Sequence, residues 1–304
     1  MLSREQVETY REQGYLLVED VIDQELLERL RRATHEMIDR SRAVTASDAV
    51  FDLDEGHSAE RPRLTRIKQP HLNVPGFDEV LHAPKVKAAL QALLGPAVRL
   101  QTTKLNTKAP GGGAAVEWHQ DWAFYPHTND DLLAVGLMLE DVDEANGPLM
   151  VIPGTHKGPV LSHAVNGVFA GAIDPADPLF ERDKAVTLTG RAGSMTVHHV
   201  RLLHGSAPNM SDRARLICFY ELAAADAWPL AGGSTAFVGL TPQQVWEKIQ
   251  AGMAYGEPTI RPRLADVPVL LPLPPAPDQG SIFKIQQSAG AASAFAKPER
   301  RDAA

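Results

Sequence analysis

The stretch SMTVHHVRLLHGSAPNMSDRARLICFYEL, residues 194–222, contains two short runs rich in β-branched and aromatic residues, at 194–200 and 215–222. A turn-rich segment, His204-Gly205-Ser206-Ala207-Pro208-Asn209, separates them. Such runs, bounded by Gly, Pro, Asn and Ser, predict β-strands. Similar runs occur at 98–104, 132–142, 149–152 and 185–188. Short strands separated by turn residues are typical of a β-sandwich or jelly roll.

The residues before this region have a helical pattern instead. Ser3 and Gln6 form a predicted capping box, and the first helix is expected to end near Gly14, before a short strand at 15–18. Asp23 is expected to cap a second helix, and a third is expected at 84–94. Residues 42–62 are polar and aperiodic, which predicts a loop over a site.

No repeat or long linker divides the chain, so we expect one domain over residues 1–304. Its expected parts are N-terminal helices at 1–95, a jelly-roll core at about 96–222, and a C-terminal region at 223–304. In the last part, Thr241 and Gln244 predict a helix start, and residues 262–277 are rich in Pro and predicted to be extended. The last dozen or so residues are predicted to be disordered.

Two distant motifs carry side chains that bind metals. His119 and Asp121 lie two residues apart in WHQDW, residues 118–122, after the glycines at 111–113. On a strand, residues i and i+2 point the same way, so both could reach one ion. His204 is the candidate for the third ligand. Two imidazoles and one carboxylate on one face form the ligand set of a non-haem Fe(II) centre that activates oxygen.

Arg215 opens the apolar run RLICFY at 215–220. A guanidinium in a strand that reads as buried needs an anionic partner, because burying an unpaired charge is costly. A bound dicarboxylate would supply that partner through a bidentate pair.

These motifs resemble the phytanoyl-CoA dioxygenase family. The resemblance rests on His119-Gln120-Asp121, on NGPLMVIPGTH at 146–156, and on the segment from His204 to Asn209 followed by Arg215. It is strongest over about residues 95–222. It implies a double-stranded β-helix, also called a jelly roll or cupin-like fold, and an oxygenase that depends on Fe(II) and 2-oxoglutarate.

Carried over by position, the resemblance implies that His119, Asp121 and His204 bind iron. It further implies that Arg215 and Ser206 hold the far carboxylate of 2-oxoglutarate, with Arg66 and Lys104 as further co-substrate contacts. The expected reaction uses O2 to hydroxylate a C–H bond of a small molecule and releases succinate and CO2. Because halogenating relatives replace the carboxylate with a small residue, Asp121 favours hydroxylation. The resemblance implies no catalytic residue beyond the metal ligands.

Several neighbouring residues have two interpretations. Trp122 and Phe124, with Tyr125, follow the ligand pair and form either a substrate wall or ordinary aromatic core. The basic cluster Arg61, Arg63, Arg66 and Lys68 is either a solvated edge or a pocket lining that attracts an anionic substrate. His198 and His199 are expected to be strand residues or supports of the ligands. The stretch 157–183 is predicted to be an insertion over the pocket.

Composition excludes several classes of protein. A net charge of −8 and a pI near 5.8 argue against a nucleic-acid partner. The single cysteine, Cys218, excludes an intramolecular disulfide. No apolar run predicts a signal peptide or a membrane span, so a cytoplasmic protein without a membrane partner is expected.

Two other functions fit the same residues. A jelly-roll protein could keep the metal as a sensor without turnover, although a sensor has no need of Arg215 and Ser206. A zinc hydrolase also uses two His and one carboxylate, but the motif lacks an evident general base and leaves Arg215 without a role. The sequence determines neither the substrate, CoA ester or otherwise, nor the oligomeric state.

Overall fold

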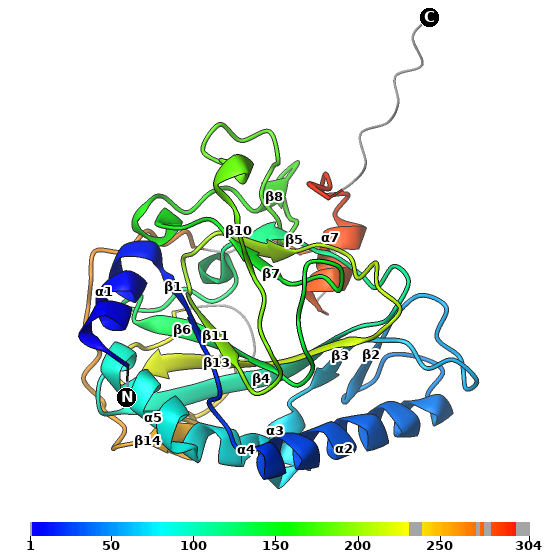
Figure 1. The fold of residues 1–304 in the computed structure, drawn as a ribbon. Helices are drawn as coiled ribbons and strands as arrows, with labels where there is room; N and C mark the ends of the chain where they lie inside the picture. The colour runs from blue at the N-terminus through cyan, green and yellow to red at the C-terminus, as the bar shows by residue number, and fades with distance from the viewer. Residues whose placement is uncertain (1, 231–238, 272–273, 277–280, 296–304) are drawn as a thin grey trace, which may run out of the picture.

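The computed structural model describes residues 2–230, 239–271, 274–276 and 281–295. Two antiparallel sheets lie one above the other, and helices cover the outer face of the larger sheet (Figure 1). The two-sheet arrangement confirms the predicted jelly roll.

The larger sheet contains strands from both the N-terminal region and the predicted core. Its longest pairing joins β13 (Arg215–Ala224) to β4 (Val98–Lys108), which run antiparallel over ten residue pairs with one β-bulge. In sheet order the strands are β1 (Tyr15–Val18), β11 (Met195–His199), β6 (Leu132–Met138), β13 (Arg215–Ala224), β4 (Val98–Lys108), β3 (Leu64–Lys68) and β2 (Phe51–Leu53), and β14 (Met253–Tyr255) also pairs with β4.

The smaller sheet has four strands within the described residues. In sheet order they are β10 (Val186–Leu188), β7 (Leu149–Val151), β12 (His204–Ser206) and β5 (Val116–His119). A separate hairpin joins β8 (Ala164–Val165) to β9 (Val168–Phe169). The segment 204–209, hereafter the distal motif, therefore begins with a strand. All three residues of β12 pair with β7, and His204 and Ser206 also pair with β5.

The helices begin at the capping residues that the sequence predicts. Ser3 and Gln6 form both hydrogen bonds of a capping box, Asp23 caps Leu26 N–H, and Thr241 forms a second capping box. The helices are α1 (Arg4–Gln13), α2 (Gln24–Arg40), α3 (Pro70–Asn73), α4 (Pro75–His82), α5 (Pro84–Leu94), α6 (Pro242–Ala251) and α7 (Ile282–Ser288). The part of the chain that the structure describes also has four 3-10 turns: η1 (Ser41–Ala43), η2 (Asp121–Ala123), η3 (Thr155–Lys157) and η4 (Arg182–Lys184).

The main apolar core lies between the helices and the outer face of the larger sheet. Leu30 of α2, Phe77 of α4 and Leu90 of α5 are fully buried there against Leu105 of β4 and Cys218 of β13. This packing leaves the other face of the larger sheet free to form the inside of the sandwich. Lys104 of β4, Glu221 of β13 and Ile282 of α7 line cavities on that inner side.

Several predicted boundaries were wrong. The strand predicted at 15–18 is confirmed as β1, but the N-terminal region also contributes β2 and β3 to the larger sheet, neither of which was predicted from the sequence. The predicted loop at 42–62 contains β2, whose Asp52 is a buried charge and so hides the strand pattern. Helices α3 and α4 span four and eight residues, too few to show helical periodicity. The predicted insertion at 157–183 contains the β8–β9 hairpin.

Other boundaries held more closely. Helix α5 spans 84–94 as predicted, while β4 continues to Lys108 and β6 ends at Met138 rather than at 142. Residues 262–271 and 274–276 form neither helix nor strand. The prediction of disorder at the chain end falls mostly on residues 296–304, which lie outside the described residues, and α7 precedes them.

Candidate metal centre

Three side chains from two adjacent segments meet at one point. His119 is the last residue of β5, Asp121 opens η2, and His204 opens β12 directly opposite His119 in the antiparallel ladder. The Nε2 atoms of His119 and His204 lie 3.6 and 3.9 Å from Asp121 Oδ1. All three ligand atoms lie within 4.8 Å of one another, and all three residues are buried. The structure therefore brings the predicted ligands together.

The expected reason for the first pair was wrong. His119 and Asp121 do not share a strand face, because β5 ends at His119 and the chain turns into η2. The turn at η2 places the Asp121 carboxylate close to both imidazoles.

Hydrogen bonds define which ring nitrogen of each ligand is free. Nδ1 of His119 lies 2.8 Å from the carbonyl oxygen of Glu117, and Nδ1 of His204 lies 2.9 Å from that of Leu202. A carbonyl oxygen only accepts, so each Nδ1 carries the proton and each Nε2 presents a lone pair. Two lone pairs and a carboxylate oxygen then face one another with no proton between them. This donor set fits a cation and matches the backbone-oriented imidazoles of metal sites.

The pKa values favour the same forms. Burial, with the neighbouring rings of His119 and His198, holds the pKa of His204 well below its ordinary value. Burial alone would raise the pKa of Asp121, but His204, His119, His198 and Lys104 hold it well below its ordinary value. Neutral imidazoles and an ionised carboxylate are the forms that bind metals.

A third histidine touches this cluster. His198 on β11 is 1% exposed, and its Nε2 lies 3.5 Å from Asp121 Oδ2, the oxygen that does not face the other two rings. Neither ring nitrogen of His198 makes a hydrogen bond with a described residue. His199 lies elsewhere, with its ring near Tyr10 and His156. The sequence expectation of a supporting residue therefore fits His198 and not His199.

His163, in the predicted insertion at 157–183, contacts the backbone between two of the candidate ligands. His163 accepts the Gln120 N–H at Nε2 (2.8 Å) and lies 2.8 Å, through Nδ1, from the Leu161 carbonyl. Burial lowers the pKa of His163 to about 4, so the ring is neutral and can accept that bond. This bond fixes the backbone between His119 and Asp121.

A narrow cavity of about 40 Å³ extends from the three ligands toward Arg215 and Ser206. Arg215 is 1% exposed, and its guanidinium makes no hydrogen bond or ion pair with any residue in the described part of the chain. Burial lowers its pKa to about 9, so it remains charged at neutral pH. An unpaired buried guanidinium fits a carboxylate ligand.

Lys108 stands beside this cation and was not singled out from the sequence. It pairs with Arg215 across β4 and β13, and its Nζ donates to the carbonyls of Ser206 (3.1 Å) and Ala207. Burial and the charge of Arg215 hold its pKa well below its ordinary value. Lys108 thus holds the backbone of the distal motif, and only the strand register could have revealed it.

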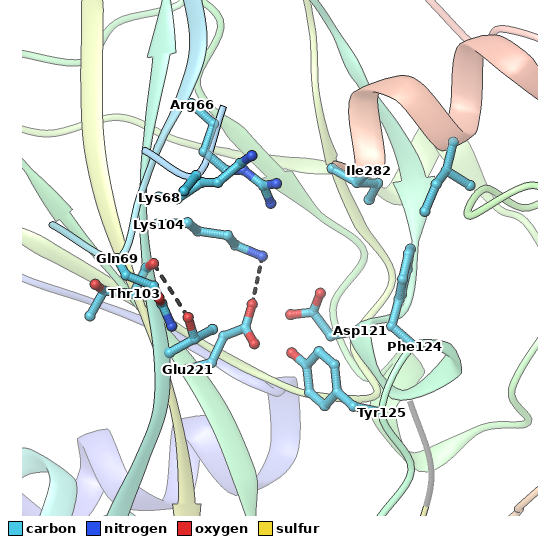
Figure 2. A pocket seen from close by; sticks show the side chains of 13 residues that line it. Arg66, Lys68, Gln69, Thr103, Lys104, Asp121, Phe124, Tyr125, Glu221 and Ile282 are labelled. Atoms are coloured by element: carbon cyan, nitrogen blue, oxygen red, sulfur yellow. Dashed lines mark hydrogen bonds and ion pairs between the residues drawn. The ribbon is translucent and has the colours of Figure 1, made fainter. Parts of the chain in front are cut away.

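A larger cavity of about 360 Å³ opens on the other side of Asp121 (Figure 2). Arg66, Lys68 and Lys104 point into it from β3 and β4, while Phe124 and Tyr125 stand near Asp121. Lys104 pairs with Glu221 at 2.7 Å. Burial alone would lower the pKa of Lys104, but Glu221 and Asp121 raise it above its ordinary value.

The remaining sequence candidates divide between these cavities. Lys104 lines both, whereas Arg66 and Phe124 line only the larger one. Trp122 lies outside both: its indole donates to the Pro268 carbonyl (2.6 Å), and it lines a separate groove.

None of the helices in the described residues combines the length and apolar character needed to cross a bilayer.

Comparisons with known proteins agree with this geometry. The family model for phytanoyl-CoA dioxygenase matches residues 10–217. A relative from Stutzerimonas stutzeri, named probable alpha-ketoglutarate-dependent hypophosphite dioxygenase, is 33% identical over 288 residues, covering 93% of this chain and 97% of the relative. An ectoine dioxygenase from Bordetella parapertussis is 28% identical, covering 72% of this chain and 75% of the relative.

A solved structure is similar in fold. EctD from S. alaskensis, in a crystal structure with bound Fe, superposes with a TM-score of 0.65 at 22% identity, covering 87% of this chain and 88% of that one. At that identity the likeness concerns the fold, and it agrees with the two-sheet architecture described above.

Proposed function

We propose residue roles for a chain that belongs to the phytanoyl-CoA dioxygenase family and that is therefore an Fe(II)- and 2-oxoglutarate-dependent dioxygenase acting on a small molecule. His119, Asp121 and His204 hold Fe(II) through two Nε2 atoms and a carboxylate oxygen. The observation that supports this assignment is a set of three facing electron-pair donors: two Nε2 atoms whose rings carry their proton on Nδ1, and one carboxylate oxygen.

Arg215 holds the far carboxylate of 2-oxoglutarate in the narrow cavity. Its lack of any partner among the described residues supports this role. The Ser206 hydroxyl, on the strand that His204 opens, is placed to share the carboxylate. Lys108 is a positioning residue, because its Nζ is already bound to the two carbonyls of the distal motif. Lys104 borders both cavities and contacts the co-substrate where the two cavities meet.

Fe(II) with 2-oxoglutarate and O2 supplies an oxidant that removes hydrogen from an unactivated C–H bond and returns a hydroxyl group, with succinate and CO2 as the other products. The protein binds, orients and excludes water. Phe124 and Ile282 form apolar walls beside Asp121, which limits the water that reaches the metal. The chain needs no nucleophile or general base of its own.

The unpaired Arg215 also separates this function from its alternatives. A zinc hydrolase or a metal-binding sensor has no use for a buried cation without a partner, which destabilises the empty fold. We further propose a single domain over residues 1–304, a cytoplasmic location in keeping with one buried thiol, and no nucleic-acid partner.

The test is an anaerobic titration of apo-protein with Fe(II) and 2-oxoglutarate. A visible charge-transfer band is expected in the wild type, and the band should be lost in His204→Ala and weakened in Arg215→Ala. His82→Ala, at an exposed position on α4, is the matched control and should keep the band. Folded protein with bound iron but no band on adding 2-oxoglutarate would contradict the proposed roles.

A further inference from the structure

The larger cavity has more positive than negative charge in one place. Arg66 and Lys68 are two residues apart on β3, so both side chains leave the same face of the strand. Both bind the same carboxylate: Arg66 Nη2 lies 2.7 Å from Asp52 Oδ2, and Lys68 Nζ lies 2.9 Å from Asp52 Oδ1. Lys68 Nζ also donates to the carbonyl oxygen of Asp48 (2.6 Å), whose carboxylate accepts the N–H groups of Val50 and Phe51. Arg66 and Lys68 therefore share one buried carboxylate, Asp52, which leaves an excess of positive charge.

The neighbouring groups do not cancel this excess. Lys68 stands directly opposite Lys104 in the β3–β4 ladder, an arrangement that repels. Two other carboxylates line the cavity: Glu221 is already paired with Lys104, and Asp121 belongs to the metal centre, with its Oδ1 3.6 and 3.9 Å from two imidazoles. A third ladder position opposes Arg66 with Asn106, which is neutral. The charge at Arg66 and Lys68 is therefore left for a ligand.

The guanidinium of Arg66 also keeps an unused donor group. Arg66 uses Nε and Nη2 for Asp52, and its Nη1 group makes no hydrogen bond with any described residue. The side chains of Arg66 and Lys68 are 18% and 29% exposed, while Asp52 beneath them is 2% exposed. Asp52 therefore binds both cations without itself lining the cavity, whereas Arg66 and Lys68 both line it.

The rest of the cavity has a different character. Figure 2 shows Arg66 and Lys68 on one side, with Ile282, Phe124 and Asp121 on the other. The α7 residues Ile282 and Ile285 add apolar surface there. A ligand that satisfied both sides would be charged at one end and apolar toward the metal.

We propose that the substrate is a small organic anion whose oxyacid group binds Arg66 and Lys68 and whose hydrocarbon part lies toward Asp121. This inference rests on the proposed function and names its substrate class. It also assigns Arg66 to substrate binding, whereas the sequence resemblance implied that this residue contacts the co-substrate.

The size of the cavity supports an organic molecule. A volume of about 360 Å³ lies in the range of roughly 300–1,000 Å³ that small-molecule sites occupy. In an ion as small as hypophosphite, the charge and the reacting hydrogens sit on one phosphorus atom. Such an ion has no separate hydrocarbon part to lie against Phe124 and Ile282.

The test is calorimetric titration of anaerobic protein loaded with Fe(II) and 2-oxoglutarate. The probes are butyrate and propylphosphonate as anions, butyramide as a neutral match, butylamine as a cation, and hypophosphite. At least one organic anion should bind tenfold or more tightly than butyramide and butylamine. Comparing butyrate with propylphosphonate tells a carboxylate site from a phosphonate site.

Variants separate the site from its surroundings. Arg66→Gln and Lys68→Gln should each weaken anion binding about tenfold, whereas Asp52→Asn should strengthen it because both cations lose their shared partner. Arg63→Gln is the matched control, since Arg63 is paired one-to-one with Asp54 and does not line the cavity. The affinity for 2-oxoglutarate, read from the visible band, should not change in Arg66→Gln.

Several results would overturn the inference. These are wild-type protein that binds no anionic probe, butyramide binding as tightly as butyrate, tighter binding of hypophosphite than of either organic anion, or unchanged anion binding in both β3 variants. Loss of 2-oxoglutarate binding in Arg66→Gln would return this residue to the co-substrate. Because calorimetry reads anion binding without the band, absence of the band would contradict the proposed function separately.

Discussion

Two arginines on opposite sides of Asp121 differ in how the fold compensates them. Arg215 is 1% exposed and has no partner among the described residues, whereas Arg66 is anchored by Asp52 and shares that carboxylate with Lys68. A fully unpaired buried cation requires its ligand in every catalytic cycle. A partly compensated cation at a wider cavity tolerates different ligands. Under the proposed roles, we expect Arg215 to accept only the co-substrate carboxylate and the Arg66 side to set selectivity for the substrate.

The most damaging change should be at the ligand between the two sides. Asp121→Ala removes one of three metal ligands, so iron affinity should fall by more than about 100-fold, since even outer partners of ligands contribute roughly 10–100-fold. Iron content after dialysis and succinate formation measure this. If Asp121→Ala kept iron and formed succinate at the wild-type rate, the metal centre would lie elsewhere.

On the co-substrate side, Arg215→Ala should weaken 2-oxoglutarate binding by roughly 100-fold, or about 3 kcal/mol, because a charged partner is lost in a buried site. Arg215→Lys should recover part of the affinity, since it restores the charge without the bidentate geometry. The anaerobic band titration measures both. Equal affinities of Arg215→Ala and wild type would remove the contrast with Arg66.

His198 tests whether the carboxylate needs support. His198→Leu removes the imidazole 3.5 Å from Asp121 Oδ2 and should weaken iron binding about tenfold. His198→Gln should recover part of that loss by donating to the same oxygen. Iron dissociation constants and the position of the visible band check this, because a purely packing role would leave the two variants alike.

Per pH unit, the effect of His163 titration on stability should be no larger than the effect of the His198 change on iron binding. The pKa of His163 is lowered to about 4 in the folded protein, against an ordinary value near 6.5. Between these values the unfolded chain binds a proton and the folded chain does not, so the free energy of unfolding should fall as pH decreases from 6.5 to 4. His163 alone contributes at most about 1.4 kcal/mol per pH unit.

Urea denaturation of the apo-protein at several pH values measures this dependence. His163→Gln, which can still accept the Gln120 N–H, should show a shallower slope than the wild type. Parallel slopes for the two proteins would show that His163 does not titrate in this window.

Local patterns predicted much of this molecule. Capping residues identified the starts of α1, α2 and α6, and turn-bounded runs identified most strands of the jelly roll. The candidate ligands His119 and Asp121 were recognisable from their local spacing, and His204 was recognisable from the residues that flank it. Short elements such as α3 and β2 were not, because a few residues carry no measurable period.

By itself, the sequence determined which side chains were available for metal and dicarboxylate chemistry, because residue type fixes donor atoms and charge. Only the tertiary structure decided their partners. It brought Lys108 beside Arg215 through strand register, placed Trp122 away from the metal, and turned Asp121 under both imidazoles. It also placed Asp52 beneath Arg66 and Lys68. Long-range pairing leaves no trace in neighbouring residues, so these contacts depend on how the two sheets pack.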